Sequence, residues 1–144
     1  MKTIHRAARL ALGATAWLAL APAGTTPASA ATWELRDFRQ QICVTSSGGH
    51  PGTYFIAAVV GTWSTTVQIA LQNLPPGATS MGGTPIAPGS NYPDPDDGST
   101  TVNGFVHISI PPLPVGVYTP LVTASDGTET QSYPVTINVK QSCY

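Results

Sequence analysis

Residues suited to acid–base catalysis are few beyond position 30. The histidines there are His50, in an expected loop, and His107, on an expected strand. The sequence has no Gly-x-Ser-x-Gly elbow, no neighbouring Cys–His pair and no phosphate-binding glycine loop. Four carboxylates fall at strand ends or turns and suggest no facing pair for glycoside hydrolysis: Glu34, Asp37, Asp126 and Glu129. We therefore expect a protein that is not an enzyme and uses no cofactor, a small hydrolase with an unrecognised site being the catalytic alternative.

An acidic cluster, Asp94, Asp96 and Asp97 followed by Gly98, has the oxygen ligands that Ca²⁺ prefers. The spacing does not match an EF-hand loop, no bidentate glutamate follows, and two prolines stiffen the segment. A solvated turn is the expected structure, and a Ca²⁺ site formed by these three aspartates is the alternative.

Aromatic side chains give a second candidate site. The candidates are Trp33, Trp63 and Tyr92, and also Tyr54. These rings could stack on sugar rings or anchor a protein interface if they are exposed. The alternative is that Trp33 covers the end of a sheet and Trp63 packs over the core. A domain of this size needs bulky side chains inside it.

The N-terminal segment has the pattern of a secretory signal peptide. Lys2, Arg6 and Arg9 precede a short apolar run, and an Ala-x-Ala sequence ends at Ala30. We expect residues 1–30 to be the leader and residues 31–144 to be one secreted, extracellular domain. Without the leader, three basic residues face seven acidic ones. That balance argues against nucleic acid and anionic membranes as partners.

The two cysteines, Cys43 and Cys143, are expected to pair because disulfides persist outside the cell. Their positions predict a bond that joins the first and last strands. In the chain-entropy model, a closed loop of about 100 residues contributes roughly 4–5 kcal/mol to stability.

Two-residue alternation sets the fold class. Val67, Ile69 and Leu71 alternate with polar residues, and Val106 and Ile108 alternate with Phe105 and His107. The expected strands lie at 32–35, 42–45, 53–60, 65–73, 78–86, 101–110, 116–124 and 131–140. Only residues 34–41 could form a helical turn. Seven or eight short strands in one all-β domain predict a β-sandwich.

Two segments make the prediction more specific: GTWSTTVQIALQNLPPGATS and VHISIPPLPVGVYTPLVTASDGTETQSYPVTINVK. Together they resemble bacterial immunoglobulin-like modules over residues 52–140. The resemblance implies an immunoglobulin-like β-sandwich with Tyr118 in a tyrosine corner, its hydroxyl bonded to upstream backbone. The mature chain is also similar to a family of small secreted proteins of unknown function from high-GC Gram-positive bacteria.

These features favour a secreted, non-catalytic binding module for an extracellular glycan, the cell wall or another secreted protein. The alternative is an extracellular protease inhibitor that presents the loop 82–98. Prolines within that loop would lower the ordering cost of binding. Against it, inhibitor loops are usually braced by a nearby disulfide, and the cysteines lie elsewhere in the sequence.

Overall fold

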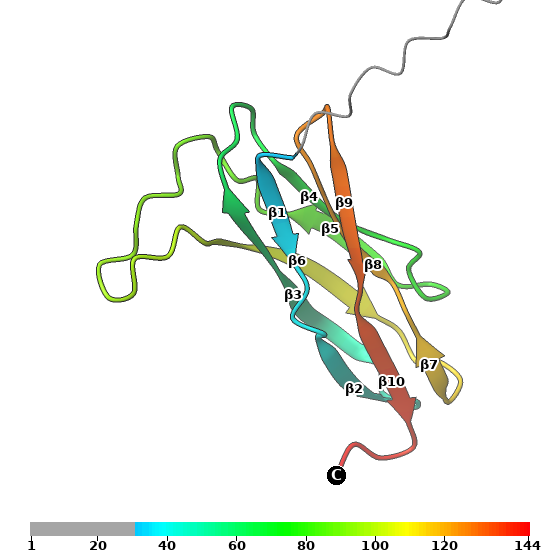
Figure 1. Ribbon diagram of the computed structural model, residues 1–144. Helices are drawn as coiled ribbons and strands as arrows, with labels where there is room; N and C mark the ends of the chain where they lie inside the picture. The colour runs from blue at the N-terminus through cyan, green and yellow to red at the C-terminus, as the bar shows by residue number, and fades with distance from the viewer. Residues whose placement is uncertain (1–30) are drawn as a thin grey trace, which may run out of the picture.

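A computed structural model describes residues 31–144, and the expected leader 1–30 lies outside the described residues. These residues form strands and loops (Figure 1). No helix in this range is long and apolar enough to span a membrane. The ten strands are β1 (Trp33–Arg36), β2 (Gln41–Thr45), β3 (His50–Gly61), β4 (Gln68–Gln72), β5 (Thr79–Gly83), β6 (Val102–Ile110), β7 (Gly116–Tyr118), β8 (Leu121–Ser125), β9 (Thr130–Pro134) and β10 (Thr136–Lys140).

The first layer is an antiparallel sheet in the order β1-β3-β6-β5. The alternation predicted for β6 is confirmed, because Val106, Ile108 and Ile110 are buried while Phe105 and His107 are exposed. Strand β3 also contains the consecutive buried residues 57–59. The middle of this sheet is therefore covered on both faces at that point.

The second layer consists of two short sheets, β4-β8-β9 and β2-β10-β7. Each of the expected strands 116–124 and 131–140 is divided in two, which raises the strand count from seven or eight to ten. The first division falls at Pro120, whose ring nitrogen cannot donate a ladder hydrogen bond. The second division falls at Val135, between β9 and β10. The Val135 N–H donates to the Pro120 carbonyl oxygen at 2.9 Å, so the two interruptions lie side by side and are hydrogen-bonded to each other.

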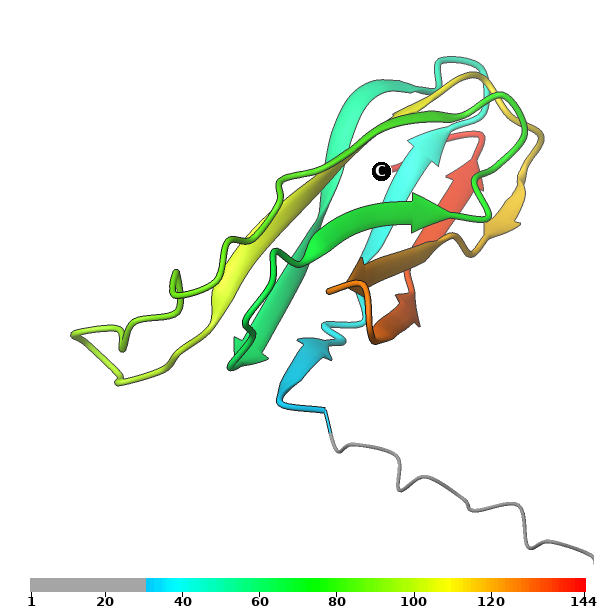
Figure 2. The ribbon, with the colours of Figure 1, turned by 90° about the horizontal axis from the view of Figure 1, so that it is seen from above.

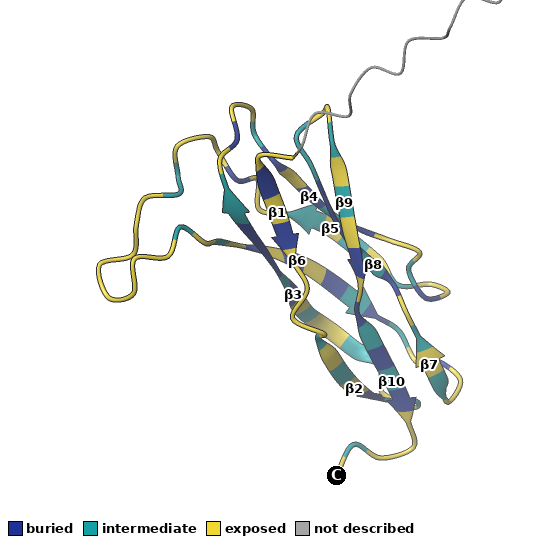
Figure 3. Cartoon of the chain, in the orientation of Figure 1, coloured by how far each residue is buried: buried dark blue, intermediate teal, exposed yellow. Residues whose placement is uncertain are grey.

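This topology is that of an immunoglobulin-like sandwich. Four strands form one sheet, the opposite layer has β4, β8 and β9, and the first edge strand switches layers between β1 and β2. Strand β2 then runs parallel to the last strand, β10. Figure 2 shows the two layers from above, and Figure 3 shows, by colour along the chain, that strands of both layers contain buried residues. The predicted fold class is confirmed.

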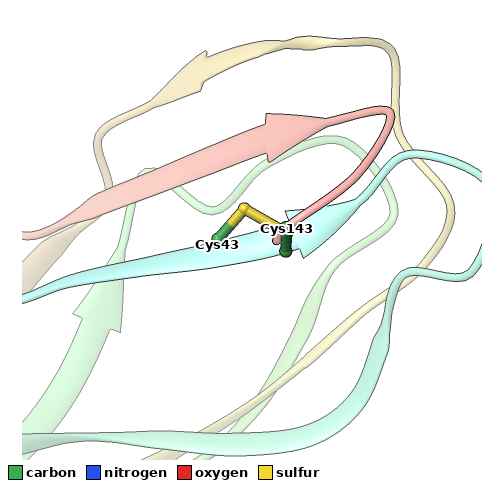
Figure 4. Close-up of a disulfide and its surroundings, with 2 residues drawn as sticks. All are labelled: Cys43 and Cys143. Carbon is green, nitrogen blue, oxygen red and sulfur yellow. A yellow bond between two sulfur atoms is a disulfide. The ribbon is translucent and has the colours of Figure 1, made fainter.

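The predicted disulfide is present and joins Cys43 to Cys143 with the two Cα atoms 5.7 Å apart (Figure 4). Its position differs in detail from the expectation. Cys43 lies on β2, the second strand, and Cys143 lies in the tail that follows β10. The cause is the change of layer, because β1 pairs with β3 and leaves β2 to pair with the C-terminal strand.

The helical turn considered for residues 34–41 does not form. Strand β1 extends to Arg36 and pairs with β3. The chain then turns at Arg39, whose φ of 50° is left-handed, and the Arg39 N–H donates to Asp37 Oδ1 at 2.6 Å. Pairing with β3 buries Leu35, and an isolated eight-residue helix would be marginally stable.

Candidate binding surface

The outer face of β3, β5 and β6 carries a cluster of exposed aromatic side chains. Tyr54 is 50% exposed and Phe105 is 39% exposed, and their ring centroids lie 5.3 Å apart at an interplanar angle of 84°. The Tyr54 ring also lies 6.0 Å from the His107 ring, in an edge-on arrangement. We call the outer side of these three strands the aromatic face.

Strand register brings these rings together. Tyr54 lies directly opposite His107, and Phe105 lies opposite Ile56, the next outward residue of β3. Tyr54 and Phe105 are thus diagonal neighbours, a separation that aromatic side chains can bridge. Edge-to-face geometry is favourable for such a pair because the edge of one ring is electropositive and the face of the other is electronegative.

A shallow pocket of about 230 Å³ adjoins the rings at the β5 side. Its lining includes the side chains of Met81 and His107 and three hydroxyl residues, Thr53, Thr79 and Ser109. The pocket is smaller than the roughly 300–1,000 Å³ typical of drug-sized ligand sites. It can therefore receive a single side chain or ring rather than an enclosed small molecule.

Met81, at the edge of this pocket, is 91% exposed. It lies where the β5–β6 register shifts between Ser80 and Gly83. Gly82 has a φ of 82°, which suits glycine, and the Ser80 hydroxyl bonds to the carbonyl oxygen of His107 at 2.7 Å. The irregularity fixes the backbone on both sides of Met81, as β-bulges near functional surfaces often do.

The aromatic face lacks acidic residues and also lacks lysine and arginine. Strands β3, β5 and β6 include no lysine, arginine, aspartate or glutamate along their entire lengths. Exposed charged residues of the same sheet lie on β1, at Glu34 and Arg36. The sheet thus has an uncharged centre and a charged margin.

Two of the predicted binding residues, Trp33 and Trp63, are buried at 3% and 7% exposure. The expectation that they offer exposed rings is corrected in favour of the core alternative. Each indole N–H is satisfied inside the protein: Trp33 Nε1 donates to Asp126 Oδ2 at 2.9 Å, and Trp63 Nε1 donates to the Ala87 carbonyl at 2.9 Å. Each ring is thus held by its burial and by the hydrogen bond of its indole N–H.

The partner of Trp33, Asp126, organises the β8–β9 turn. Its Oδ1 accepts the N–H of Glu129 at 2.8 Å, and the N–H and hydroxyl of Thr128 at 2.9 and 2.8 Å. These bonds favour the ionised carboxylate, so the pKa of Asp126 is lowered, the Glu129 N–H being the largest cause. One carboxylate thus connects the turn to the start of β1.

Tyr92 has the exposure expected of a binding residue, at 77%. It lies in the connection between β5 and β6, which extends from the sandwich (Figure 1), whereas Tyr54 and Phe105 lie on β3 and β6. Because Trp33 and Trp63 are buried, the three predicted residues do not form one exposed aromatic site.

The acidic cluster forms a turn. Asp94 Oδ1 accepts the N–H of Asp96 and Asp97 Oδ1 accepts the N–H of Ser99, each at 2.8 Å. The Ser99 N–H, and secondarily its hydroxyl, lowers the pKa of Asp97. Within residues 31–144, no group of three His, Cys, Asp or Glu side chains could hold a metal ion. The arrangement is a turn in which one carboxylate oxygen of Asp94 and one of Asp97 accept backbone N–H groups.

The two histidines lie in the same half of the β3–β6 ladder. His107 faces outward on β6, as expected, opposite Tyr54, and His50 is paired with Ile110 at the end of the ladder. The His50 Nδ1 atom is buried without a hydrogen-bond partner. Nucleophilic catalysis by serine requires a histidine that is hydrogen-bonded to the nucleophile and oriented by a third group. Among the described residues, neither imidazole is hydrogen-bonded to a serine or to a carboxylate.

Tyr118, at the end of β7, makes the hydrogen bond expected of a tyrosine corner. Its hydroxyl donates to the carbonyl oxygen of Pro114, four residues upstream, at 3.1 Å. The bond secures the connection from β6 to β7 and is structural in character.

The model of a family described as a family of unknown function (DUF5980) matches residues 34–141. Among solved structures, the chain is similar to a PapD-like (ASH) domain of human CEP192, with a TM-score of 0.37 and 13% identity over 85% of this chain and 94% of that one. It is also similar to part of a family 123 glycoside hydrolase from Clostridium perfringens, with a TM-score of 0.32 and 11% identity over 72% of this chain and 23% of that one. No curated protein sequence matches the chain. These low structural scores lend nothing to the choice of a function.

Proposed function

The chain belongs to the family of unknown function DUF5980, and we propose that it is a secreted, non-catalytic module that binds another extracellular protein through its aromatic face. The observation that carries the proposal is the exposed Tyr54–Phe105 pair on the aromatic face, whose three strands contain no lysine, arginine, aspartate or glutamate.

The composition of the face supports a protein partner. Tyrosine, phenylalanine and methionine are enriched at the cores of protein interfaces, whereas lysine, glutamate and aspartate are depleted there. Tyr54, Phe105 and the exposed Met81 are of the first kind, and strands β3, β5 and β6 lack the second kind entirely. Exposed apolar side chains that gather in one patch often mark a protein-interaction site.

The orientation of the rings favours a protein over a polysaccharide. Tyr54 and Phe105 stand at 84° to each other, so they do not form the flat, continuous platform on which successive sugar rings could stack. A wedge of two perpendicular rings beside a side-chain-sized pocket suits the uneven surface of a folded protein.

The polar groups of the face support binding rather than catalysis. The neighbour of the His107 imidazole is the Tyr54 ring, and the pocket contributes hydroxyl groups without a carboxylate. A general base must lie within hydrogen-bond reach of the group from which it takes a proton. The surroundings of His107 therefore favour a contact residue over a catalytic base.

Site-specific photo-crosslinking in an exporting host tests the proposal. A photoreactive residue is placed at Met81 on the aromatic face or, as a matched control, at the exposed Gln72 on the opposite sheet. The expected result is a discrete adduct with one secreted protein at position 81 only. The yield of this adduct should fall about tenfold or more when Tyr54 is changed to serine, because anchor side chains contribute most of the binding energy.

Other results would contradict the proposal. Equal adducts at positions 81 and 72, or adducts that persist unchanged with Tyr54→Ser, would show that the aromatic face does not select a partner. Retention on cellulose, chitin or peptidoglycan that depends on Tyr54 would replace the protein partner with a glycan. Adducts only between two copies of this chain, with a dimer in size-exclusion chromatography, would replace it with self-association.

A further inference from the structure

The connection between β5 and β6, residues 84–101, is a second exposed feature that the aromatic face does not explain. It exceeds the roughly 12–15 residues beyond which loops without secondary structure are uncommon in compact domains, and such loops usually have a function. Figures 1 and 2 both show it extending from the sandwich, away from β2 and β10.

The first part of this loop is fixed to the body of the protein. Ile86 is buried and forms two backbone hydrogen bonds with Val67, each 2.9 Å long. The next residue, Ala87, accepts the indole N–H of the buried Trp63 at 2.9 Å. The Asn91 side-chain amide then donates to the carbonyl oxygen of Gly61, at the end of β3.

The last part of the loop is fixed to itself. The Asp94 N–H donates to the Ser99 carbonyl at 2.7 Å, and the Gly98 N–H donates to the Asp94 carbonyl at 2.8 Å. The two Asx hydrogen bonds described above close the same turn. Pro85, Pro88, Pro93 and Pro95 restrict the backbone further by fixing φ at these four positions.

Tyr92 lies between these two fixed parts. The preceding residue, Asn91, is hydrogen-bonded to the end of β3. The following residue, Pro93, leads directly into the closed turn. The tyrosine ring is nevertheless 77% exposed. A large aromatic side chain held outward on a preorganised backbone has the features of an interface anchor, because little ordering entropy is lost when it is bound.

We propose that this loop inhibits extracellular serine proteases of aromatic specificity by inserting Tyr92 into their specificity pocket. Such a pocket is a deep apolar slot that accepts one aromatic side chain from an extended segment. Tyr92 is uncharged and projects singly, which matches that slot. The bond that would be cleaved joins Tyr92 to Pro93, and the proline ring crowds this bond and leaves a tertiary amide without an N–H. The loop is therefore expected to bind as a substrate does and to resist cleavage.

The disulfide does not brace this loop, since Cys43 and Cys143 tie β2 to the C-terminal tail. The anchoring hydrogen bonds of Trp63 and Asn91, together with the prolines, take over that role. The proposal is independent of the aromatic face, because Tyr92 is in a different segment and none of its neighbours lines the pocket near Met81.

Titration of the full, oxidised chain against chymotrypsin, subtilisin and trypsin tests the proposal, with chromogenic peptide substrates as the readout. The expected result is competitive inhibition of chymotrypsin and subtilisin, with trypsin unaffected. Tyr92→Ala should raise the inhibition constant about thirtyfold or more, as expected for loss of an interface anchor. Tyr92→Lys should transfer inhibition to trypsin, because the acidic trypsin pocket accepts a basic side chain.

Tyr144→Ala is the matched control, since it removes an exposed tyrosine that lies outside both the loop and the aromatic face, and it should leave inhibition unchanged. Circular dichroism should show that the Tyr92 variants keep the wild-type fold, because the ring is exposed. Absence of inhibition at large molar excess, rapid cleavage after Tyr92, or equal inhibition by the wild type and Tyr92→Ala would each overturn the proposal. None of these results bears on the partner of the aromatic face.

Discussion

The side-chain amide of Gln40 makes both backbone hydrogen bonds of Ile56 that a neighbouring strand would otherwise make. Gln40 Oε1 accepts the Ile56 N–H at 2.8 Å and Gln40 Nε2 donates to the Ile56 carbonyl at 2.7 Å. Strand β1 has ended at Arg36, so this amide extends the edge of the sheet beyond it. The Tyr133 hydroxyl, from the opposite layer, donates to the same carbonyl and accepts from Gln40 at 2.9 Å. One glutamine thus connects both layers where the chain changes sheet.

Gln40→Ala should therefore lower the free energy of unfolding by about 2–3 kcal/mol, because it leaves the N–H of Ile56 without its partner in a partly buried position. Urea unfolding followed by circular dichroism measures the change. Gln72→Ala, at an exposed position of β4, is the control and should change stability by less than about 0.5 kcal/mol. Equal effects of the two substitutions would show that the Gln40 bonds add nothing to stability.

Tyr133→Phe should alter the alkaline stability of the protein. Burial of the hydroxyl raises the pKa of Tyr133 to about 12, the hydrogen bond from Gln40 opposing the shift. Because this pKa is raised above the ordinary value of about 10, the stabilisation is complete below about pH 10 and is lost between about pH 10 and about pH 12. The loss amounts to about 2–3 kcal/mol. Unfolding measured across that window should show a smaller decline in the variant, and an identical decline would refute the assignment.

Asp126→Asn should alter acid stability in the opposite window. The folded-state pKa is lowered by the Glu129 N–H and by its other donors, so its contribution is present above about pH 4 and is lost as the pH falls further. The variant should have a lower melting temperature at neutral pH and a smaller drop on acidification. Asp96→Asn is the control, since its carboxylate accepts no hydrogen bond in the structure, and it should behave as the wild type does. A wild-type acid profile for Asp126→Asn would contradict this linkage.

Replacement of both Cys43 and Cys143 by serine should lower the free energy of unfolding by about 4–5 kcal/mol, the chain-entropy value for a closed loop of about 100 residues. Guanidinium unfolding of the variant and of the oxidised wild type measures the difference. Reduced wild type should unfold as the variant does. A loss below about 1 kcal/mol would show that the unfolded chain is not constrained as this model assumes.

The sequence predicted those parts of the fold that depend on local pattern. Alternation placed β4 and β6 on their correct faces, and a Gly-x-Tyr sequence located the hydrogen bond from Tyr118 to Pro114. Alternation did not reveal that β1 and β2 belong to different layers. The change of layer is stabilised by the Gln40 amide, which bonds to the backbone of Ile56 in place of a strand, and this tertiary contact has no local sequence pattern. The divisions at Pro120 and at Val135, which follows Pro134, could have been anticipated because proline is unfavourable inside a paired strand.

The candidate surface was only partly foreseeable. Tyr54 was a candidate from the sequence, but Phe105 and Met81 were not, although outward alternation on β6 and the absence of charge in β3, β5 and β6 were available signals. Trp33 and Trp63 were considered because large rings bind ligands well. Residue type could not show that both indoles have hydrogen-bond partners inside the protein.

The sulfur bridge between Cys43 and Cys143 also determines how the protein responds to mechanical tension. If the two ends of the chain are pulled apart, the load passes from Cys43 to Cys143 through this covalent link. The segment between the two cysteines, which includes the aromatic face and Tyr92, then bears no stretching force. In the oxidised protein, tension can therefore extend only residues outside this loop, such as β1, whereas in the reduced protein it can also unfold the segment between the cysteines.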